Sequence, residues 1–420
     1  MKDSVFRAYP CGLLHLRRKC LIRFTTGMVS SFVGPSVHCE SLKRLLANTE
    51  VLTRTDLSRE QVEDLVSGAT ILGVGGGGNP AEGLAGLTSV LNHGGHLIIA
   101  GLDEFGEEDL LVSPYFVGSV APSKPKAEGK PAPAIPDPIA AAVSLLESNL
   151  GKRVSGTVPT EIGGGNTAAC LAIAGKLGIP MVDGDLMGRA GPELHQSTMQ
   201  IFHQSMAPSA VVSETGNRIL VESYARIDDY EAIARYASVV AGGQVAVVDS
   251  PLTKSTARDC VIQGTISKCI RIGRTRRKAV EKGQDPVPAL LGELANGRLL
   301  LKGKVEKYAW RDEKGFLFGE VTVSGEGEWR GKKFRSWIMN EHIMGWTDDR
   351  PSVMPPDLIM FLEPSDGSGI TNDRLEKGVE VSVVGASAPE VWRKPSGLAV
   401  FGPRHFGFDY DYVPFEAMQS

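Results

Sequence analysis

The sequence predicts an α/β fold, with a three-layer α/β domain and a partly parallel sheet, followed by a C-terminal β-rich, barrel-like domain. Apolar residues at helical spacing alternate with short apolar runs over residues 50–296, which is typical of layered α/β domains. From about Gly297 the apolar period changes to two, as in antiparallel strands. We therefore expect an N-terminal extension at 1–49, a glycine-rich α/β domain at 50–296 and a β-rich domain at 297–415.

The expected elements follow from capping residues and apolar spacing. Ser58 and Gln61 form a capping box that begins a helix running through Val66. The other expected helices have an apolar stripe and cover 81–92, 138–150, 167–177, 192–205, 229–241 and 264–279. The expected strands are shorter apolar or alternating runs at 96–100, 179–182, 298–310, 316–324, 334–340 and 379–384, with a hairpin around 214–217.

Composition argues against several classes of protein. The chain has 420 residues, of which 42% are hydrophobic and 22% charged, as in a soluble globular protein. A net charge of −4 argues against a nucleic-acid partner, and no apolar run reaches the ~18 residues of a membrane span. Six cysteines without a CxxC pair indicate reduced thiols in the cytoplasm. The first 40 residues are basic, so a mitochondrial transit peptide is the alternative, and the Pro-rich stretch 119–138 is expected to be a surface loop.

Two glycine-rich turns are candidate binding elements. The first, Gly73–Gly78, satisfies G-x-G-x-x-G, and Asp103 follows where a dinucleotide fold places its ribose-binding acid. A dinucleotide-dependent oxidoreductase is therefore one alternative function, although four consecutive glycines match this pattern easily. The second turn, Gly163–Gly165, precedes Asn166 and a helix whose free N–H groups suit an anionic group. An ordinary capped turn is the alternative interpretation of this second turn.

Polar side chains gather after the expected strand at 179–182. Asp183 and Asp185 lie at its carboxyl end, where open α/β sheets bind ligands, and an extended chain turns both toward one face. Such a pair either binds a divalent cation or divides into an acid and a base. His195 would complete a zinc or manganese site with them. Alternatively, one aspartate caps a turn and the other pairs with Arg189.

At these residues the chain resembles the S-methyl thiohydantoin desulfurase family, which is associated with hydantoinases and oxoprolinases. The resemblance covers about residues 50–415. It rests jointly on Leu72–Pro80, Glu161–Asn166, Ile179–Leu194, Asn340–Glu341, Pro356–Ile359, Gly402–Arg404 and Phe406–Asp409. It implies a three-layer α/β domain with a β-barrel-like domain, and hydrolytic removal of sulfur from a cyclic ring with a divalent metal. Gly191, His195 and Met339 depart from the family's usual residues, which puts the substrate in question.

Residues and resemblance together predict a hydrolase that cleaves C–S or C–N bonds of cyclic thiohydantoins or hydantoins. The expected catalytic residues are Asp183, Asp185, Glu193 and Glu161, and the expected metal ligands are Asp183, Asp185 and His195. The expected substrate-binding residues are Gly75, Gly76, Gly77, Gly164, Gly165, Asn166, Arg189, Asn340 and Glu341. A further alternative is a non-catalytic subunit of a hydantoinase/oxoprolinase-type enzyme. Besides a small-molecule substrate, the expected partners are such a protein and further copies of this chain, with no nucleic acid and no membrane.

Overall fold

The structure is a computed structural model that describes residues 54–119 and 134–418. All of the described elements fall within one unit, Leu52–Ser420. The expected N-terminal extension, with Cys11, Cys20 and Cys39, and most of the expected Pro-rich loop lie outside the described residues. The three described cysteines, Cys170, Cys260 and Cys269, are buried free thiols.

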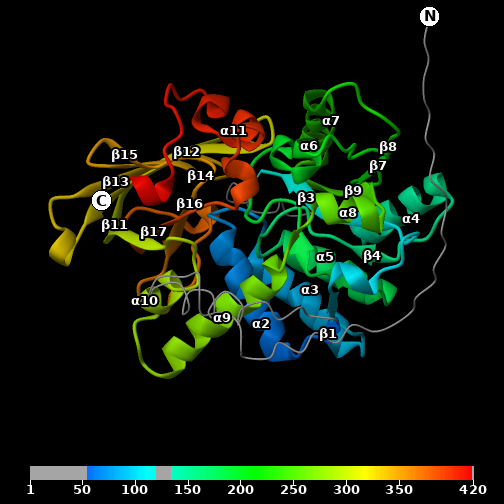
Figure 1. Cartoon of the computed structure of the whole chain (residues 1–420), viewed down its shortest axis with the longest axis horizontal. Coiled ribbons are helices and arrows are strands. Elements are labelled where there is room, and N and C mark those ends of the chain that lie inside the picture. The colour runs from blue at the N-terminus through cyan, green and yellow to red at the C-terminus, as the bar shows by residue number, and fades with distance from the viewer. Residues whose placement is uncertain (1–53, 120–133, 419–420) are drawn as a thin grey trace, which may run out of the picture. The chain divides into compact units, whose positions relative to one another are not determined.

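An eight-stranded mixed sheet, sheet A, forms the first part of the fold (Figure 1). Its strand order is β1-β2-β5-β4-β3-β9-β7-β8. The pairs β2–β5, β5–β4 and β4–β3 are parallel, and the other neighbouring pairs are antiparallel. The strands are β1 (Arg54–Asp56), β2 (Ile98–Ala100), β3 (Leu111–Gly118), β4 (Gly156–Thr157), β5 (Met181–Val182), β7 (Ser209–Val212), β8 (Arg218–Val221) and β9 (Gln244–Leu252).

Helices cover both faces of sheet A, which makes the three layers. One face packs against α4 (Pro138–Leu150) and α5 (Asn166–Leu177), and the other against α7 (Ile227–Ala241) and α8 (Lys254–Cys260). Strand β9 shows why both faces of sheet A are covered by helices. Its side chains alternate between two apolar clusters, one on each face. Val245 and Val247 join the cluster on the α7 side, whereas Ala246 and Val248 join the one on the α4 side.

A curled antiparallel sheet, sheet C, forms the C-terminal part in the order β15-β14-β13-β12-β11-β17-β16. Its strands are β11 (Arg298–Glu313), β12 (Phe316–Gly325), β13 (Lys333–Met339), β14 (Glu341–Thr347), β15 (Arg350–Val353), β16 (Leu358–Leu362) and β17 (Glu380–Ala386). Ile359 and Phe361 of β16 point into the core of the curled sheet. Leu358, Met360 and Leu362 join the helical core outside it, so β16 is buried on both faces.

That helical core contains α2 (Arg59–Leu72), α3 (Pro80–Asn92), α9 (Thr265–Glu281) and α10 (Pro286–Leu291). Helix α2 crosses α9 at two glycines whose backbones touch the partner helix. A Cβ at Gly68 would lie 1.9 Å from the Cys269 carbonyl oxygen, and one at Gly273 would lie 1.9 Å from that of Asp64. Any side chain at either position would therefore force α2 and α9 apart.

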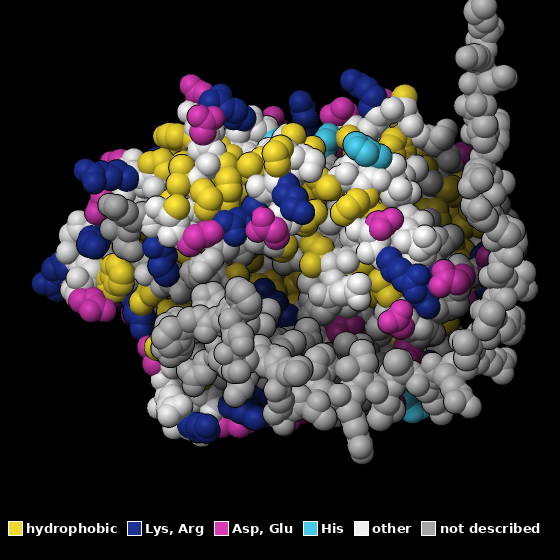
Figure 2. Space-filling view, in the orientation of Figure 1, with side chains coloured by type: hydrophobic (Ala, Val, Ile, Leu, Met, Phe, Trp, Pro, Cys, Tyr) yellow, Lys and Arg dark blue, Asp and Glu magenta, His cyan; other side chains and the backbone are white. Residues whose placement is uncertain are grey.

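Charged side chains of both signs share the surface in Figure 2. On the face shown, Lys and Arg lie among Asp and Glu in the described part of the chain, with apolar side chains between them. No helix among the described residues has the length and apolar character needed to cross a membrane.

The predicted fold class is confirmed, and most predicted elements lie within two residues of the observed ones. The helix predicted over 192–205 is wrong: a 3-10 turn at Leu194–Gln196 is followed by the short α6 (Thr198–Ile201). A tertiary contact competes with helix formation at this point, because the Leu194 amide donates to the Glu231 carboxylate. The helix from Ser58 continues to Leu72. The elements that the sequence analysis did not predict include β1, β3, β9, α8, α10, β14, β15 and β16. The boundaries at 49/50 and 296/297 stay predictions.

We expect Gly273→Ala to lower the free energy of unfolding by about 1–3 kcal/mol, because its methyl group overpacks the α2–α9 contact. Gly86→Ala is the matched control. Gly86 lies within α3, and the nearest atom to its added Cβ would be 4.0 Å away. The higher helix propensity of alanine should therefore raise the free energy of unfolding by about 1 kcal/mol. Chemical denaturation followed by circular dichroism compares the two, and equal effects would contradict the tight crossing.

Candidate functional site

The two glycine turns pack directly against each other. A Cβ at Gly77 would lie 2.5 Å from the Gly163 Cα, and one at Gly163 would lie 2.3 Å from the Gly77 Cα. The Gly77 carbonyl accepts hydrogen bonds from the Gly165 and Asn166 amides, both at 3.0 Å. Glycine is required here because the two backbones touch. The amides at the start of α5, which were expected to face an anion, instead hold the first turn in place.

The first turn is held in a strained conformation from the side of sheet C. Val74 has φ +45°, which is rare for a β-branched residue, and Gly75 has φ +96°. The His342 amide donates to the Val74 carbonyl at 2.9 Å, and the Asn372 amide donates to the Gly75 carbonyl at 2.8 Å. Backbone strain of this kind is concentrated at functional sites, so it supports a role for this turn beyond folding.

Glu161 is a buried carboxylate between β4 and the second glycine turn. Its Oε1 accepts from Asn166 Nδ2 at 2.8 Å, and its Oε2 accepts from the Gly191 amide at 3.1 Å. Asn166 is therefore not the helix cap that the sequence suggested, because its side chain orients Glu161 and bonds the Phe116 backbone. The gap between β4 and α5 thus presents one fixed, buried carboxyl group.

Glu341 reaches the same region from sheet C. It is the first residue of β14, and a Cβ at Gly76 would lie 1.9 Å from its Oε1. Its Oε2 is buried and has no hydrogen-bond partner. Asn340 turns the chain into this position at φ +54°, and its Oδ1 accepts from the Leu317 amide at 2.9 Å. The glycine at 76 therefore makes room for the Glu341 carboxyl group.

Burial and mutual repulsion favour the protonated forms of these two groups. Burial raises the pKa of Glu161, against the hydrogen bonds from Asn166 and Gly191. Burial, and then the Glu161 charge, raise the pKa of Glu341 well above its usual range. Two guanidinium groups, Arg189 and Arg235, oppose both shifts. The site thus holds two interacting carboxyls whose pKa values are both raised.

Arg189, which was expected to bind substrate, is fully buried. It donates to the backbone carbonyls of Ala190, Pro356, Asp357 and His342 at 2.6–3.4 Å. Burial lowers its pKa to about 10, so it stays positively charged at neutral pH. Arg189 therefore joins the strand containing Glu341 to the segment after Asp185 and supplies positive charge without reaching a surface.

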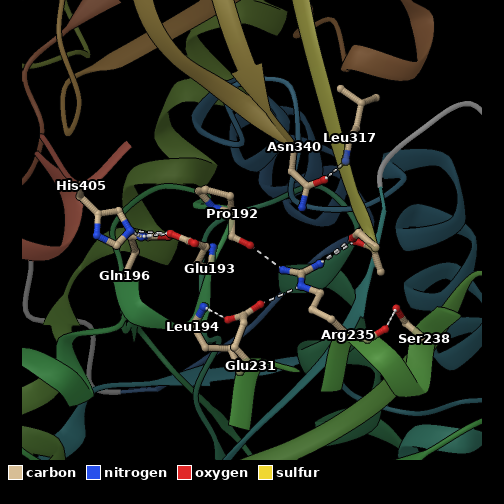
Figure 3. A network of polar contacts seen from close by, with 12 residues as sticks. Pro192, Glu193, Leu194, Gln196, Glu231, Arg235, Ser238, Leu317, Asn340 and His405 are labelled. Atoms are coloured by element: carbon tan, nitrogen blue, oxygen red, sulfur yellow. Dashed lines mark hydrogen bonds and ion pairs between the residues drawn. The ribbon is translucent and has the colours of Figure 1, made fainter. Parts of the chain in front are cut away.

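Arg235 on α7 is the centre of a second polar network (Figure 3). Its Nε donates to Glu231 Oε1 at 2.7 Å, and its other nitrogens donate to the carbonyls of Gly118, Gly315 and Pro192. These bonds tie α7 to strand β3, to the β11–β12 hairpin and to the segment after Gly191. Arg235 thereby fixes the chain whose Gly191 amide holds Glu161.

Asp183 and Asp185 have different hydrogen-bond partners. Asp183 accepts from the Ser267 amide at 2.9 Å and the Ser267 hydroxyl at 2.6 Å, so it caps the start of α9. Asp185 accepts from the Met187 and Gly188 amides at 2.9 and 2.6 Å through one oxygen. Burial raises the pKa of Asp185 to about 7, and Glu161 adds to this shift. Asp185 thus belongs electrostatically with Glu161, whereas Asp183 has a structural partner.

Glu193 and His195 lie in a separate polar cluster. Glu193 Oε2 pairs with His405 Nε2 at 2.6 Å (Figure 3), and His195 Nε2 faces Asp228 Oδ1 at 3.2 Å. Burial raises the pKa of Glu193, but the His405 and Gln196 hydrogen bonds outweigh burial and lower it. The contacts with His405 and Asp228 hold Glu193 and His195 in this cluster.

The expected metal ligands do not fit a metal ion in this arrangement. Both oxygens of Asp183 are bound to Ser267, and one oxygen of Asp185 is bound by backbone amides, while His195 pairs elsewhere. Within residues 54–119 and 134–418, no three His, Cys, Asp or Glu side chains are grouped to hold a metal. A metal requirement therefore stays a prediction of the resemblance.

The first glycine turn does not have the surroundings of a dinucleotide site. That fingerprint requires a strand before the glycines, but α2 runs through Leu72 and leads directly into the turn. Asp103 lies in a 3-10 turn, faces Arg258 at 3.5 Å and is largely exposed. The apolar run at 69–72 belongs to a helix because it continues the stripe of α2, which explains the mistaken alternative.

A surface groove of about 360 Å³ approaches the second glycine turn. Its lining includes Thr70, Pro80, Arg276 and Arg374. Thr70 and Pro80 also contact Gly164, since a Cβ there would lie 2.4 Å from the Thr70 hydroxyl and 2.8 Å from the Pro80 Cβ. Two residues that line the groove therefore lie next to the turn that follows Glu161.

The structure brings together Gly75, Gly76, Gly77, Gly164, Gly165, Asn166, Glu161, Asp185, Arg189, Asn340 and Glu341. It places Asp183, Glu193 and His195 in other contacts. Sequence reasoning missed Arg235 and Asn372. The Glu231-to-Arg235 spacing on an expected helix was the available signal for Arg235, and nothing local distinguishes Asn372.

Comparisons with known proteins agree with this architecture. The family model described as S-Me-THD-like, N-terminal domain matches residues 60–223, and the S-Me-THD-like, C-terminal domain matches residues 225–415. This chain belongs to the S-Me-THD-like family. A comparison with curated proteins finds no match. A crystal structure of a protein from Chromobacterium violaceum is 20% identical with a TM-score of 0.68, covering 86% of this chain and 99% of that one, which shows the fold.

Asp183 in this S-Me-THD-like protein is expected to act as a helix cap. Asp183→Ala and Ser267→Ala should each lower the free energy of unfolding by about 1 kcal/mol, and the double variant should lose less than the sum, because both remove one interaction. Elemental analysis of the same samples serves as the second measurement. Loss of a bound metal from Asp183→Ala alone would show that the aspartate is a ligand.

Asp185 should make stability depend on pH. Its folded-state pKa of about 7 exceeds the unfolded value, so the stability it contributes is complete below about pH 4 and is lost as the pH rises to about 7. Asp185→Asn should remove this loss, which is about 4 kcal/mol at most, from roughly 1.4 kcal/mol per pH unit. Urea titrations of both proteins from pH 4 to 8 measure the difference. Parallel curves would contradict a raised pKa at Asp185.

Proposed function

We propose that this protein is a hydrolase of thiohydantoin- or hydantoin-type rings in which Glu161 and Glu341 act as acid and base. One ionised carboxylate takes a proton from water as its oxygen attacks the ring carbon that bears sulfur. The protonated partner gives its proton to the sulfur as the C–S bond breaks. For an S-methyl thiohydantoin the leaving group is methanethiol. The ring carbon is left with a hydroxyl group whose proton moves to the ring nitrogen to give the carbonyl, and the two carboxyls have exchanged protonation states.

The single observation that supports this proposal is the buried, interacting pair of carboxyls at the glycine turns. One shared proton is the expected state of such a pair, because the first negative charge raises the pKa of the second group. A pair with one acid and one base is what hydrolysis of a cyclic amide carbon requires. The family name, which refers to thiohydantoin, supports the ring as substrate.

Two guanidinium groups favour negative charge in this region. Arg189 and Arg235 are buried, and their own hydrogen bonds go to backbone carbonyls and Glu231. Positive charge fixed in a water-poor environment stabilises the negative charge that develops as water attacks. Both arginines act in this proposal by position rather than by touching the ring.

Replacing either carboxyl should remove activity. Glu161→Gln and Glu341→Gln should each lower kcat by about 10²–10⁴, the range for loss of a general acid or base. Purified full-length protein would be assayed for methanethiol release from an S-methyl thiohydantoin and for ring opening of hydantoin. Glu293→Gln is the matched control, since Glu293 is partly buried and bound by Arg271 and Thr275 away from the turns. Retained turnover in both folded variants would refute the assignment.

A further inference from the structure

The surface groove beside the second glycine turn combines two arginine side chains with an apolar wall. Arg276 from α9 and Arg374 from the 3-10 turn Asn372–Arg374 both line it. The apolar lining comes from α2 and α3, through Val66, Pro80, Ala81 and Leu84. Its volume of about 360 Å³ lies at the low end of the range for small-molecule sites, roughly 300–1,000 Å³. The groove therefore has room for a small ligand with an apolar body.

The two guanidinium groups keep most of their hydrogen-bond donors free. Arg374 Nη2 lies 3.5 Å from Glu363 Oε1, and Arg276 Nη2 lies 3.8 Å from Asp366 Oδ2. Among the described residues, these two guanidinium groups make one hydrogen bond, from Arg276 Nε to the Ser67 hydroxyl at 3.0 Å. Each guanidinium has five N–H donors, so both arginines can donate to a ligand in the groove.

The acidic side chains near these arginines compete weakly for them. Burial raises the pKa of Asp366, but hydrogen bonds from Ser368 and then both arginine charges lower it. Asp366 Oδ1 already accepts from the Ser368 amide and hydroxyl, at 2.9 and 2.7 Å. At 3.5 and 3.8 Å, Glu363 and Asp366 make ion pairs rather than hydrogen bonds with the arginines, and surface pairs of this kind contribute little. A ligand carboxylate that accepts hydrogen bonds directly can therefore take their place.

We infer that this groove binds a small organic carboxylate with an apolar body. The carboxylate accepts hydrogen bonds from Arg276 and Arg374, whose planar N–H groups match its two oxygens. The apolar body lies against Val66 and Leu84. Inorganic phosphate has the charge for the arginines but nothing to place on the apolar wall. The inference concerns binding alone and does not depend on the proposed hydrolase reaction.

The groove also lies next to residues that support both glycine turns. Thr70, in its lining, contacts the second turn, since a Cβ at Gly164 would lie 2.4 Å from the Thr70 hydroxyl. Arg374 belongs to the same 3-10 turn as Asn372, whose backbone amide donates to the Gly75 carbonyl at 2.8 Å. A ligand held between Thr70 and Arg374 would therefore add contacts to the supports of both turns.

Matched small ligands test this inference on the unaltered full-length protein. Calorimetric titration would compare phenylacetate and 4-methylpentanoate with their amides, with acetate and with inorganic phosphate. The two apolar carboxylates should bind with a Kd of roughly 1 mM or tighter, as expected for ligands of this size. Their amides and acetate should bind about 10-fold more weakly or worse, because the amides lose the charge-assisted hydrogen bonds and acetate loses the apolar contact. Phosphate should not displace phenylacetate at equal concentration.

Charge variants give the second measurement. Arg276→Gln and Arg374→Gln should each weaken phenylacetate binding by about 10-fold, since each removes one guanidinium from the groove. Arg226→Gln is the matched control, because Arg226 pairs with Asp229 at the start of α7, outside the groove. Glu63→Gln should strengthen binding by about threefold, because Glu63 lines the groove and repels an anion. A gain in affinity cannot result from loss of the fold, and thermal melting identifies any arginine variant that fails to fold.

Each outcome decides for or against the carboxylate site. Binding that requires the carboxylate, falls in both arginine variants and rises in Glu63→Gln supports it. Equal binding of phenylacetate and phenylacetamide overturns it, and so does unchanged affinity in both arginine variants. Displacement of phenylacetate by an equal concentration of phosphate indicates a general anion site and overturns the assigned ligand class. Absence of binding by both apolar carboxylates also overturns the inference, while turnover in the Glu161 variants judges the hydrolase proposal separately.

Discussion

The contact between the backbones of Gly77 and Gly163 is the constraint on which the rest of the candidate site depends. Because neither residue has a side chain, the Gly77 carbonyl reaches the first amides of α5. This contact fixes the first turn relative to sheet A, and the next residues along it, Gly75 and Gly76, then face sheet C. A methyl group at either contact would separate the turns and move Glu341 away from Glu161.

The electrostatics of the site follow from this geometry. Closing the two turns removes water from Glu161 and Glu341, and burial is the largest cause of both raised pKa values. Arg189 and Arg235 offset part of that cost, but each is held by backbone carbonyls and cannot move to form a direct pair. The pKa values of both carboxyls therefore stay raised, whereas a direct ion pair with an arginine would lower them.

Local sequence patterns were sufficient for the parts of this structure that depend on local physics. Glycine spacing, Pro138 and the capping box at Ser58 predicted turns and helix ends because capping acts within a few residues. The contact of Asp183 could not be predicted, since its partner Ser267 is 84 residues away in helix α9. The pairing of Glu161 with Glu341 likewise depends on how sheet C folds back onto the turns, which no local pattern encodes.

The site is divided between the two matched family regions, and this division has a structural consequence. Residues 60–223 contribute both glycine turns, Glu161 and Arg189, whereas residues 225–415 contribute Arg235, Glu341 and Asn372. Neither region by itself contains both carboxyls, and the strained Val74 turn needs the amides of His342 and Asn372. The proposed acid–base pair needs both regions folded together, because each region supplies one of its two carboxyls.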